Sequence, residues 1–343
     1  MNILLISPVV PPITPESRYL GIEREVWEYS RELVKSHKVS VIGHAKSVYP
    51  EGVTLLGTEP PYHYFDLELK AHQEYQYLYR TFDVIHDWSH QHLASRYVPN
   101  LPSLNIFFHA PALAQYPKAP YNIIALSQWA AREFKRVYHQ EARYQYSIGI
   151  DTSVYKLSPR HRTDRFLTIG RMSPEKGNLD AVSVCATAQV PIDVVGGRGF
   201  EKTGSDPPTE YEEAIKKACD GKERKVLGEV SEEQKVKLMK DCRALLYIPP
   251  PNHPEVTSHK IQEAMCCGTP IITQQLGALP EIVTNGVNGY LCSRLDGYLK
   301  AIDEVDKLDV QSIYKETVER FDIKNVVKAY ISLYESVAEG LRW

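Results

Sequence analysis

Short apolar segments and amphipathic segments alternate along most of the chain. Residues 3–7 form an apolar run that predicts a buried strand, and a proline-rich loop follows at residues 8–15. Residues 22–33 then carry apolar side chains at helical spacing, and residues 39–42 predict the next strand. This order of strand, loop, helix and strand is typical of doubly wound parallel sheets.

The alternation predicts two domains of the same kind. It stops at residues 151–165, a polar and basic stretch that is interpreted as a linker, and then it restarts. We expect an N-terminal domain at 1–152, a C-terminal domain at 153–320, and at 321–343 a helix that returns to the N-terminal domain. Before the linker, further strands are expected at 53–56, 83–86, 103–108 and 122–126, and helices at 67–80 and 128–138. After it, strands are expected at 166–169, 192–195, 225–227, 244–248, 271–273 and 290–292, and helices at 177–188, 210–219, 232–242 and 260–267. The fold class is therefore α/β, with two facing, Rossmann-like, doubly wound domains and an interdomain cleft.

Composition narrows the class of protein. The chain has 343 residues, 43% of them hydrophobic and 24% charged, which fits a globular protein of two domains. A net charge of −3 argues against a general nucleic-acid binder, which would carry a basic surface. No stretch approaches the ~18 apolar residues of a membrane span, and the first apolar run is too short for a signal peptide. We therefore expect a cytoplasmic protein.

Candidates for metal ligation are few. All six cysteines lie in the second half without a C-x-x-C pair, so reduced and mostly buried thiols are the preferred interpretation. His86, Asp87, His90 and His92 form a cluster that could ligate a metal in principle. A polar loop that lines the interdomain cleft is the preferred interpretation of this cluster. We therefore expect no metal site.

The first candidate site residues are two cations near the start of the second domain. Arg171 directly follows the predicted strand 166–169, and Lys176 precedes the helix that begins at Gly177. In an open α/β sheet, ligands bind beyond the carboxyl ends of the strands, where helix N-termini favour anions. The two cations therefore suit a diphosphate. A solvated basic loop is the competing interpretation, and it would be preferred if the motif stood alone.

Two glutamates, Glu255 and Glu263, are separated by seven residues. Glu255 lies in the loop after a predicted strand, and Glu263 lies about two turns into the following helix. A carboxylate can accept two hydroxyl groups, which suits a ribose diol or vicinal sugar hydroxyls. Such a spacing is common by chance, but together with the two cations it favours a site for a nucleotide sugar.

Further candidates stand at other junctions between loops and helices. His259 and Lys260 lie in the first turn of a predicted helix, where cations are mildly unfavourable unless a phosphate binds nearby. Gly196 and Gly197 follow a predicted strand, and they either allow a ligand to approach the backbone or form a plain turn. Gly277 has the same two interpretations.

The N-terminal domain contributes two candidates. His109 follows the predicted strand 103–108 and is expected to face the cleft as a general acid or base, or as a hydroxyl ligand. Gly21 lies at the first turn from strand to helix, where it could face the diphosphate from the other side. A structural histidine and an ordinary turn are the competing interpretations.

With these residues the chain resembles the retaining nucleotide-sugar glycosyltransferases of family four, which have the GT-B fold. The resemblance covers nearly the whole length and is densest from Thr168 to Leu291. In the second half it rests on Gly170-Arg171 with Lys176-Gly177, on residues 226–233, on Glu255-x7-Glu263, and on residues 277–281 and 285–289. In the first half it rests on residues 19–24, 83–86 and 148–151, and on His109.

The resemblance implies a role for each candidate residue. Arg171 and Lys176 would neutralise the leaving diphosphate, Glu263 would hold the ribose, and Glu255 would hold the donor sugar. His109 would contact the donor sugar near the reaction centre. The implied diphosphate, nucleotide and donor-sugar loops also include Gly21, Gly196, Gly197, Val256, Thr257, Ser258 and His259.

The resemblance also implies a reaction. Such enzymes retain the anomeric configuration, usually without a metal, and this chain has no D-x-D motif. The nucleoside-diphosphate sugar is a substrate, so no cofactor is expected. The acceptor, a sugar, a glycan or a lipid-linked molecule, stays open, as do the base and the sugar of the donor.

The chain departs from the family pattern at several loops. The family commonly has Pro-Phe-Gly-Leu-Val after the first glutamate, and this chain has residues 256–260 there, with Ser258 in place of glycine. Leu20 and Ala278 replace glycines in two other loops. These departures keep a catalytically impaired, nucleotide-sugar-binding paralogue as an alternative.

Other classes of protein are weaker alternatives. A nucleotide-sugar epimerase or phosphorylase would use the same two-domain layout. A dinucleotide oxidoreductase is disfavoured because a proline-rich loop stands where G-x-G-x-x-G would follow the first strand. A non-catalytic sugar-binding protein of two lobes would usually carry an export signal.

The predicted helix at 128–138 and the residues after it carry four basic side chains with aromatic residues between them. This segment could rest on an anionic membrane surface if the acceptor is a lipid. An ordinary solvated helix face is the preferred interpretation.

Overall fold

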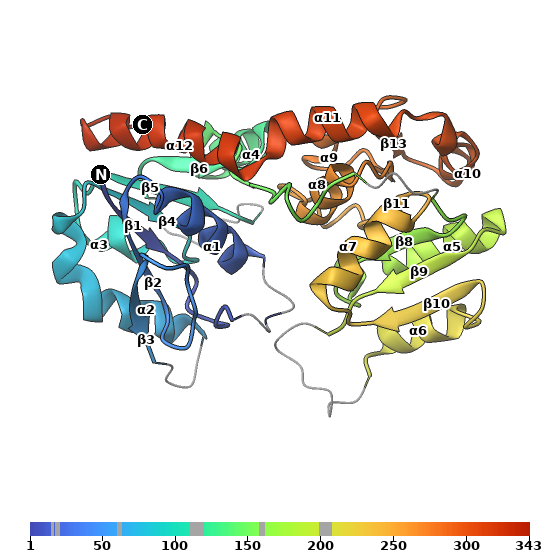
Figure 1. Ribbon diagram of the computed structural model, residues 1–343, viewed down its shortest axis with the longest axis horizontal. Helices are drawn as coiled ribbons and strands as arrows, with labels where there is room; N and C mark the ends of the chain where they lie inside the picture. Colours follow the sequence, from blue (N-terminus) through green and yellow to red (C-terminus); the bar gives the residue numbers. More distant parts are fainter. Residues whose placement is uncertain (15–16, 18–20, 60–63, 110–119, 158–161, 199–207) are drawn as a thin grey trace. The chain divides into compact units, whose positions relative to one another are not determined.

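The structure is a computed structural model that describes residues 1–14, 17, 21–59, 64–109, 120–157, 162–198 and 208–343 (Figure 1). The chain divides into two compact units: unit 1 contains Met1–Gly149 and Asp322–Trp343, and unit 2 contains Ile150–Phe321. The sequence analysis placed these divisions after residues 152 and 320. Leu20, one of the departures noted above, lies outside the described residues.

Unit 1 is built from alternating strands and helices. Its strands are β1 (Asn2–Ile6), β2 (Lys38–His44), β3 (Thr54–Thr58), β4 (Val84–Asp87), β5 (Ser103–Phe107), β6 (Ile123–Ala125) and β7 (Arg143–Tyr144). Its helices are α1 (Ile22–Leu33), α2 (Tyr64–Tyr75), η1 (Gln76–Thr81), α3 (Leu93–Tyr97), α4 (Gln128–Tyr138) and α12 (Ile323–Ala338).

Unit 2 repeats the alternation. Its strands are β8 (Phe166–Ile169), β9 (Ile192–Val195), β10 (Arg224–Gly228), β11 (Leu245–Tyr247), β12 (Ile271–Gln274) and β13 (Gly289–Cys292). Its helices are η2 (Pro174–Lys176), α5 (Asn178–Ala188), α6 (Glu210–Ala218), α7 (Glu232–Asp241), α8 (His259–Cys266), α9 (Leu279–Ile282), α10 (Leu295–Glu304), η3 (Val305–Lys307) and α11 (Val310–Phe321).

Both sheets are parallel and doubly wound. The strand order is β3-β2-β1-β4-β5-β6-β7 in unit 1 and β10-β9-β8-β11-β12-β13 in unit 2, with parallel pairing throughout the described ladders. The strand order therefore reverses between β1 and β4 in unit 1, and between β8 and β11 in unit 2. Loops that leave the carboxyl ends of such a strand pair diverge, which leaves room for a ligand.

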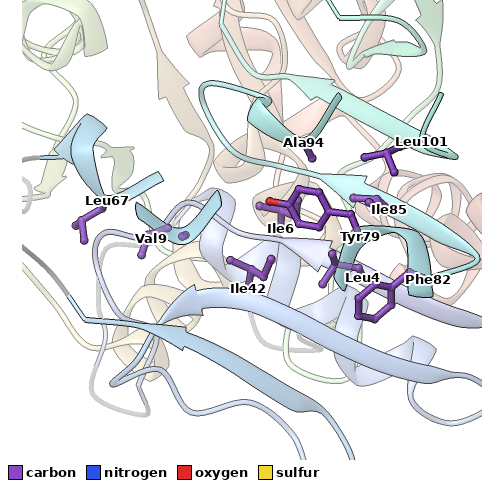
Figure 2. Close-up of a cluster of buried hydrophobic side chains, with 11 residues drawn as sticks. Leu4, Ile6, Val9, Ile42, Leu67, Tyr79, Phe82, Ile85, Ala94 and Leu101 are labelled. Atoms are coloured by element: carbon purple, nitrogen blue, oxygen red, sulfur yellow. The ribbon is translucent and has the colours of Figure 1, made fainter. Parts of the chain in front are cut away.

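The inner strands β1, β4, β5 and β6 of the unit 1 sheet are buried on both faces, which explains their apolar runs. Leu4 and Ile6 of β1 point to one face, where they pack with Ile85 of β4 and with Tyr79 of η1 (Figure 2). Alternate residues of the same strand, such as Leu5, are also fully buried. Because successive side chains of a strand point to opposite faces, these alternate residues point to the second face of the sheet.

Helix α12 closes the second face of unit 1 with aromatic side chains. Tyr330 and Tyr334 of α12 contact Tyr29 of α1 and His86 of β4, and ring centroids in this group lie 5.0–5.9 Å apart. The Tyr334 hydroxyl lies 2.6 Å from Nδ1 of His86. Burial lowers the pKa of His86 well below its usual value, so its imidazole is neutral. The last helix of the chain is thus part of the first unit.

The helices of unit 2 form two groups around its sheet. Helix α5 contacts α6 and α10, whereas α8 contacts α7 and α11. Strands β8 and β9 are buried along their whole length, as the apolar runs at 166–169 and 192–195 predict. Among the described residues, none of the helices has the length and hydropathy that a membrane span requires.

Candidate functional site

The loop after β8 is held against the loop after β11 by a glycine. Gly177, between η2 and α5, has a φ of +63°, and a Cβ atom there would overlap the carbonyl oxygen of Ile248. Glycine alone allows both the left-handed conformation and this close approach. The neighbouring Lys176 is thereby brought beside the chain that leaves β11, at the point where the strand order of unit 2 reverses.

Lys176 and Glu255 form an ion pair at this point. The Lys176 Nζ atom donates a hydrogen bond to Glu255 Oε1 at 2.9 Å, and the side chains are 25% and 20% exposed. The hydroxyl group of Tyr247, the last residue of β11, donates to the same carboxylate oxygen. Burial favours the protonated acid, but Lys176, Lys260 and the Tyr247 hydroxyl outweigh it and lower the pKa of Glu255 below its usual value. Glu255 is therefore an ionised acceptor at neutral pH.

The backbone of Glu255 is fixed by the loop at Gly277. This glycine has a φ of +56°, and a Cβ atom there would overlap the carbonyl oxygen of Glu255. The next residue, Ala278, donates its N–H to the same carbonyl at 2.8 Å. From the sequence, either the close approach of a ligand or an ordinary turn could account for Gly277. The close neighbour that the structure gives it is Glu255 itself, so the glycine serves to position an acid.

Lys260 lies among the predicted cations and acids. Its Nζ atom donates to the carbonyl oxygen of Ile169, the last residue of β8, at 2.9 Å, and it lies 3.5 Å from the ring centroid of Tyr247. Burial and the positive charges of Lys176 and Arg171 lower the pKa of Lys260 well below its usual value, although Glu255 and Glu263 act in the opposite direction. The charges of all four residues that the sequence predicts for the ligand thus affect the pKa of Lys260.

Arg171 is the most accessible of the predicted cations. Its side chain is 44% exposed, and one guanidinium nitrogen lies 3.2 Å from Oε1 of Glu175. Glu175 also accepts a hydrogen bond of 2.6 Å from the Ser173 hydroxyl, and its pKa is below the usual value. An exposed ion pair of this kind contributes little to stability. An incoming phosphate can therefore compete for the guanidinium at little cost.

Glu263 is buried and held by partners that the sequence analysis did not consider. Its two carboxylate oxygens accept hydrogen bonds of 3.1 and 3.2 Å from Lys235 of α7, and Oε1 accepts one of 2.8 Å from the Tyr155 hydroxyl. Tyr155 and Lys235 also contact Glu232. The carboxylate of Glu263 is thus fixed in place by two side chains of unit 2.

The two glycines after β9 lie next to the Arg171 loop. The carbonyl oxygen of Gly197 accepts a hydrogen bond of 2.8 Å from the N–H of Met172, and Gly196 donates to the carbonyl of Gly228 at 2.9 Å. A Cβ atom on Gly197 would overlap the carboxylate of Glu229. The space that Gly197 leaves is therefore filled by a side chain of unit 2 itself.

The segment between the two glutamates forms the entrance to α8. Val256, Thr257 and Ser258 are buried, and His259 is half-buried as the first residue of the helix. Ser258 occupies the N-cap position but makes no capping hydrogen bond with its side chain. The backbone N–H groups in the first turn of α8 therefore receive no hydrogen bond from the Ser258 side chain.

Gly21 and His109 belong to unit 1. Gly21 is exposed at the N-terminus of α1, and a Cβ atom there would meet nothing within 4 Å. His109 is exposed just beyond β5, and its ring lies nearly parallel to that of His90, 14° apart in plane with centroids at 5.7 Å. His109 thus stands at the carboxyl edge of its sheet, as predicted.

In the histidine-rich stretch at 86–92, His86 and Asp87 belong to strand β4, and residues 88–92 form the loop that follows it. His86, Asp87 and His92 are 0%, 0% and 2% exposed. They are buried because His86 and Asp87 end strand β4, and helix α12 covers His86 from a distant part of the chain. Among the described residues, no group of three or more histidine, cysteine, aspartate or glutamate side chains is arranged to hold a metal.

Helix α4 turns its aromatic side inward. Phe134 is 1% exposed and packs against Phe107 and Ile123, while Tyr138 packs against the same group. Arg136, on the exposed side, pairs with Glu133 at 2.8 Å. The arrangement of α4 is that of an amphipathic helix with a solvated basic face.

Parts of the chain match known proteins in sequence. Residues 151–316 match the family described as "Glycosyl transferases group 1". A probable sucrose-phosphate synthase of Thermosipho melanesiensis is 34% identical over 88 residues, which are 24% of this chain. The chain matches only 21% of the length of that synthase.

Solved structures match over the whole chain. AviGT4, described as a glycosyltransferase involved in avilamycin A biosynthesis, has a TM-score of 0.74 at 19% identity and covers 100% of this chain and 99% of its own. HepE of Anabaena, in complex with UDP and glucose, has a TM-score of 0.75 at 18% identity and covers 98% and 100%. The sucrose-phosphate synthase of Thermosynechococcus elongatus has a TM-score of 0.74 at 15% identity and covers 99% and 100%. Together with the two parallel sheets, these likenesses show the two-domain, Rossmann-like GT-B fold.

Proposed function

We propose that the chain transfers a sugar from a nucleoside-diphosphate sugar to an acceptor, because residues 151–316 match the family described as "Glycosyl transferases group 1". One observation carries the proposal. At the point of unit 2 where the strand order reverses, Lys176 bonds to Glu255 at 2.9 Å, and Lys176 and Lys260 both approach Gly170, the residue before Arg171. Glu263 lies in the same helix as Lys260. Cations for a diphosphate and acids for sugar hydroxyls therefore occupy one site.

The cations suit the leaving group. When the bond between the sugar and the diphosphate breaks, negative charge develops on the phosphate oxygen that departs. Lys176, held by Glu255, and Arg171 would lie near that charge, and a preorganised cation stabilises a transition state more than it stabilises the ground state. Because these side chains can supply the neutralising charge, we propose a reaction that needs neither a metal nor a cofactor.

The acids suit the two sugars of the donor. Glu255, ionised and fixed by Lys176 and Tyr247, would accept hydroxyl groups of the transferred sugar. Glu263, fixed by Lys235 and Tyr155, would accept the ribose hydroxyls. Val256, Thr257, Ser258 and His259 would form the phosphate and sugar loop at the start of α8, and Gly196 and Gly197 would border the nucleotide.

For the reaction we propose retention of the anomeric configuration. The acceptor oxygen would attack the anomeric carbon on the face from which the diphosphate leaves. The departing phosphate oxygen would take the acceptor proton. His109 would contact the transferred sugar, and Gly21 at the N-terminus of α1 would contact the diphosphate. The acceptor is left open.

Uridine diphosphate sugars are the first donors to test, because HepE of Anabaena was solved with UDP, with UDP and glucose, and with UDP-glucose. Melting temperatures should be measured with UDP, GDP, ADP and their glucose conjugates. A ligand that binds only the folded protein stabilises it by about 2.7 kcal/mol at a hundred times its dissociation constant. We expect one of the three nucleotides to raise the melting temperature and the variant Lys176→Met to lose that response. No response to any of them would contradict the proposal.

The release of nucleoside diphosphate separates transfer from its alternatives. A transferase releases the nucleoside diphosphate in proportion to the acceptor that it glycosylates. An epimerase changes the sugar of the donor without releasing the nucleoside diphosphate. A phosphorylase would require inorganic phosphate or a free nucleoside diphosphate as co-substrate. A panel of sugars, glycans and lipid-linked acceptors should therefore be tested with the donor that binds. An impaired paralogue would bind the donor and support none of these reactions.

A further inference from the structure

Lys260 is a cation without an acidic partner in its own site. Its Nζ atom contacts the carbonyl oxygen of Ile169 and the face of the Tyr247 ring, neither of which carries a charge. Among the residues that the structure describes, no carboxylate lies within ion-pair distance of this nitrogen, because Glu255 is bonded to Lys176 instead. A half-buried ammonium in such surroundings is costly unless an anion completes them.

The neighbouring charges increase that cost. Lys176 and Arg171, on the loop after β8, repel a charge on Lys260, while Glu255 of the loop after β11 and Glu263 of α8 attract it. Burial acts against the charge as well, and the pKa of Lys260 lies well below its usual value as a result. The backbone N–H groups at the start of α8 add a further positive potential beside Lys260, the second residue of that helix.

The space in front of Lys260 is kept open by Gly170. A Cβ atom on this glycine would lie 3.2 Å from the Lys260 Nζ atom and 3.3 Å from Cβ of Lys176. The two lysines therefore converge on the same short segment at the end of β8. An anion that binds there would meet both side chains, together with the guanidinium of Arg171.

We propose that Lys260 is a third cation of the diphosphate site, and that it takes up a proton when the nucleotide binds. The inference rests on the proposed function, because it assumes that a diphosphate occupies this site. The diphosphate adds at least two negative charges where cations now face one another. These charges favour the ammonium form of Lys260, so a fraction of a proton moves from the buffer to the amine on binding.

Substitution of Lys260 should affect the stability of the protein without nucleotide differently from its affinity for nucleotide. Because the charged form of Lys260 is disfavoured without an anion, an apolar side chain of similar volume should be tolerated or favoured there. Lys260→Met is therefore expected to leave the melting temperature of the empty protein unchanged or to raise it. A lysine that only braces Ile169 and Tyr247 would give the reverse, a lower melting temperature with unchanged nucleotide affinity.

Calorimetric titration tests the proposal. UDP, GDP and ADP are titrated into the full chain at pH 8, where a terminal phosphate with a pKa near ~6 is already ionised. Each titration is repeated in buffers of different ionisation enthalpy, which measures the protons taken up. The wild type is expected to take up a fraction of a proton with the nucleotide that binds. Lys260→Met and Lys260→Gln are expected to lose this uptake and to bind about 10- to 100-fold more weakly.

Matched variants separate the explanations. Lys237→Met makes the same change on α7, where the side chain is 67% exposed, and it should leave both affinity and proton uptake unchanged. Lys260→Gln keeps a donor for the Ile169 carbonyl, so a loss shared with Lys260→Met points to the charge. Wild-type affinity and uptake in both Lys260 variants would overturn this inference alone. Failure of the wild type to bind any of the three nucleotides would overturn the proposed function and this inference together.

Discussion

Lys176 and Glu255 are joined by a hydrogen bond of 2.9 Å. The sequence predicts that Lys176 binds the diphosphate and that Glu255 binds the transferred sugar of the same ligand. In a nucleoside-diphosphate sugar these parts are adjacent, because the sugar carbon that reacts is bonded to the diphosphate. The ion pair therefore places the two binding groups side by side, as the adjacent parts of a donor require. It also holds both side chains in position before a donor binds.

Substitutions of Lys176 and Glu255 should weaken the binding of different parts of the donor. Lys176→Met removes a cation from the leaving group, so affinity for the nucleoside diphosphate should fall by about 1–3 kcal/mol. Glu255→Gln removes a sugar contact, so it should lower the affinity for the nucleotide sugar and the turnover while the affinity for the nucleoside diphosphate changes little. Calorimetry with both ligands checks this, and equal losses for both ligands in both variants would contradict the division of roles.

Glu263 should be recognised by its dependence on the ribose. We expect the wild type to bind a nucleoside diphosphate more tightly than the 2′,3′-dideoxy analogue, by about 1–3 kcal/mol for the charged hydrogen bonds lost. Glu263→Gln should reduce this difference, because it removes the ionised acceptor. Glu233→Gln, on the exposed side of α7, serves as the control. An unchanged preference in Glu263→Gln would place the ribose elsewhere.

His109 should affect the reaction more than the binding. If it contacts the transferred sugar near the reacting carbon, His109→Ala will lower kcat while the affinity for the nucleoside diphosphate stays close to that of the wild type. Steady-state rates combined with calorimetry give both quantities. A loss of nucleotide affinity with unchanged kcat would instead place the imidazole at the nucleotide.

Two glycines with similar backbone conformations allow a matched test of the site's framework. Gly177 and Gly221 have φ values of +63° and +74°, but a Cβ atom at Gly177 would overlap the carbonyl oxygen of Ile248, whereas Gly221 faces open space. Gly221→Ala should cost only the backbone strain of a left-handed alanine, about 1–2 kcal/mol. Gly177→Ala should cost more and should also weaken nucleotide binding, because Lys176 is displaced. Denaturant titration and calorimetry measure both, and equal effects would contradict the close approach.

Glu23 predicts a pH dependence of stability in unit 1. This residue is 8% exposed in the first turn of α1, and burial raises its pKa to about 7, against a weaker opposing effect of a backbone hydrogen bond. Because the folded pKa is above that of the unfolded chain, the acid stabilises the fold fully below pH ~4.5 and loses this contribution as the pH rises through ~7. Glu23→Gln should therefore raise stability at pH 8 by up to ~3 kcal/mol and change it little at pH 4.5. Equal effects at both pH values would contradict the shift.

The alternation of apolar segments was sufficient to predict most of the fold. Strands such as β8 and β9 are buried on both faces, so their apolar runs are continuous and easily recognised. Strand β7 was not predicted, since it has two residues and forms only by pairing with β6. The η1 segment was predicted as part of one long helix, because its residues continue the pattern of α2.

The candidate site was predictable in its residues but not in its contacts. Arg171 and Glu255 could be placed because strand ends are visible in the sequence. The bond from Tyr155 to Glu263 joins residues 108 positions apart, and no periodicity relates them. Tyr247 was hidden within an apolar strand, although a polar hydroxyl at the last position of a buried strand is a usable signal. His86 contacts Tyr334, 248 positions away, so the local sequence does not indicate that His86 is buried.

A crystal structure with bound UDP tests the central claim most directly. We expect the diphosphate to lie between Arg171, Lys176 and Lys260, with the ribose hydroxyls donating to Glu263 and with Glu255 beside the terminal phosphate. A nucleotide bound in unit 2 away from the loop after β8, or bound only in unit 1, would contradict it.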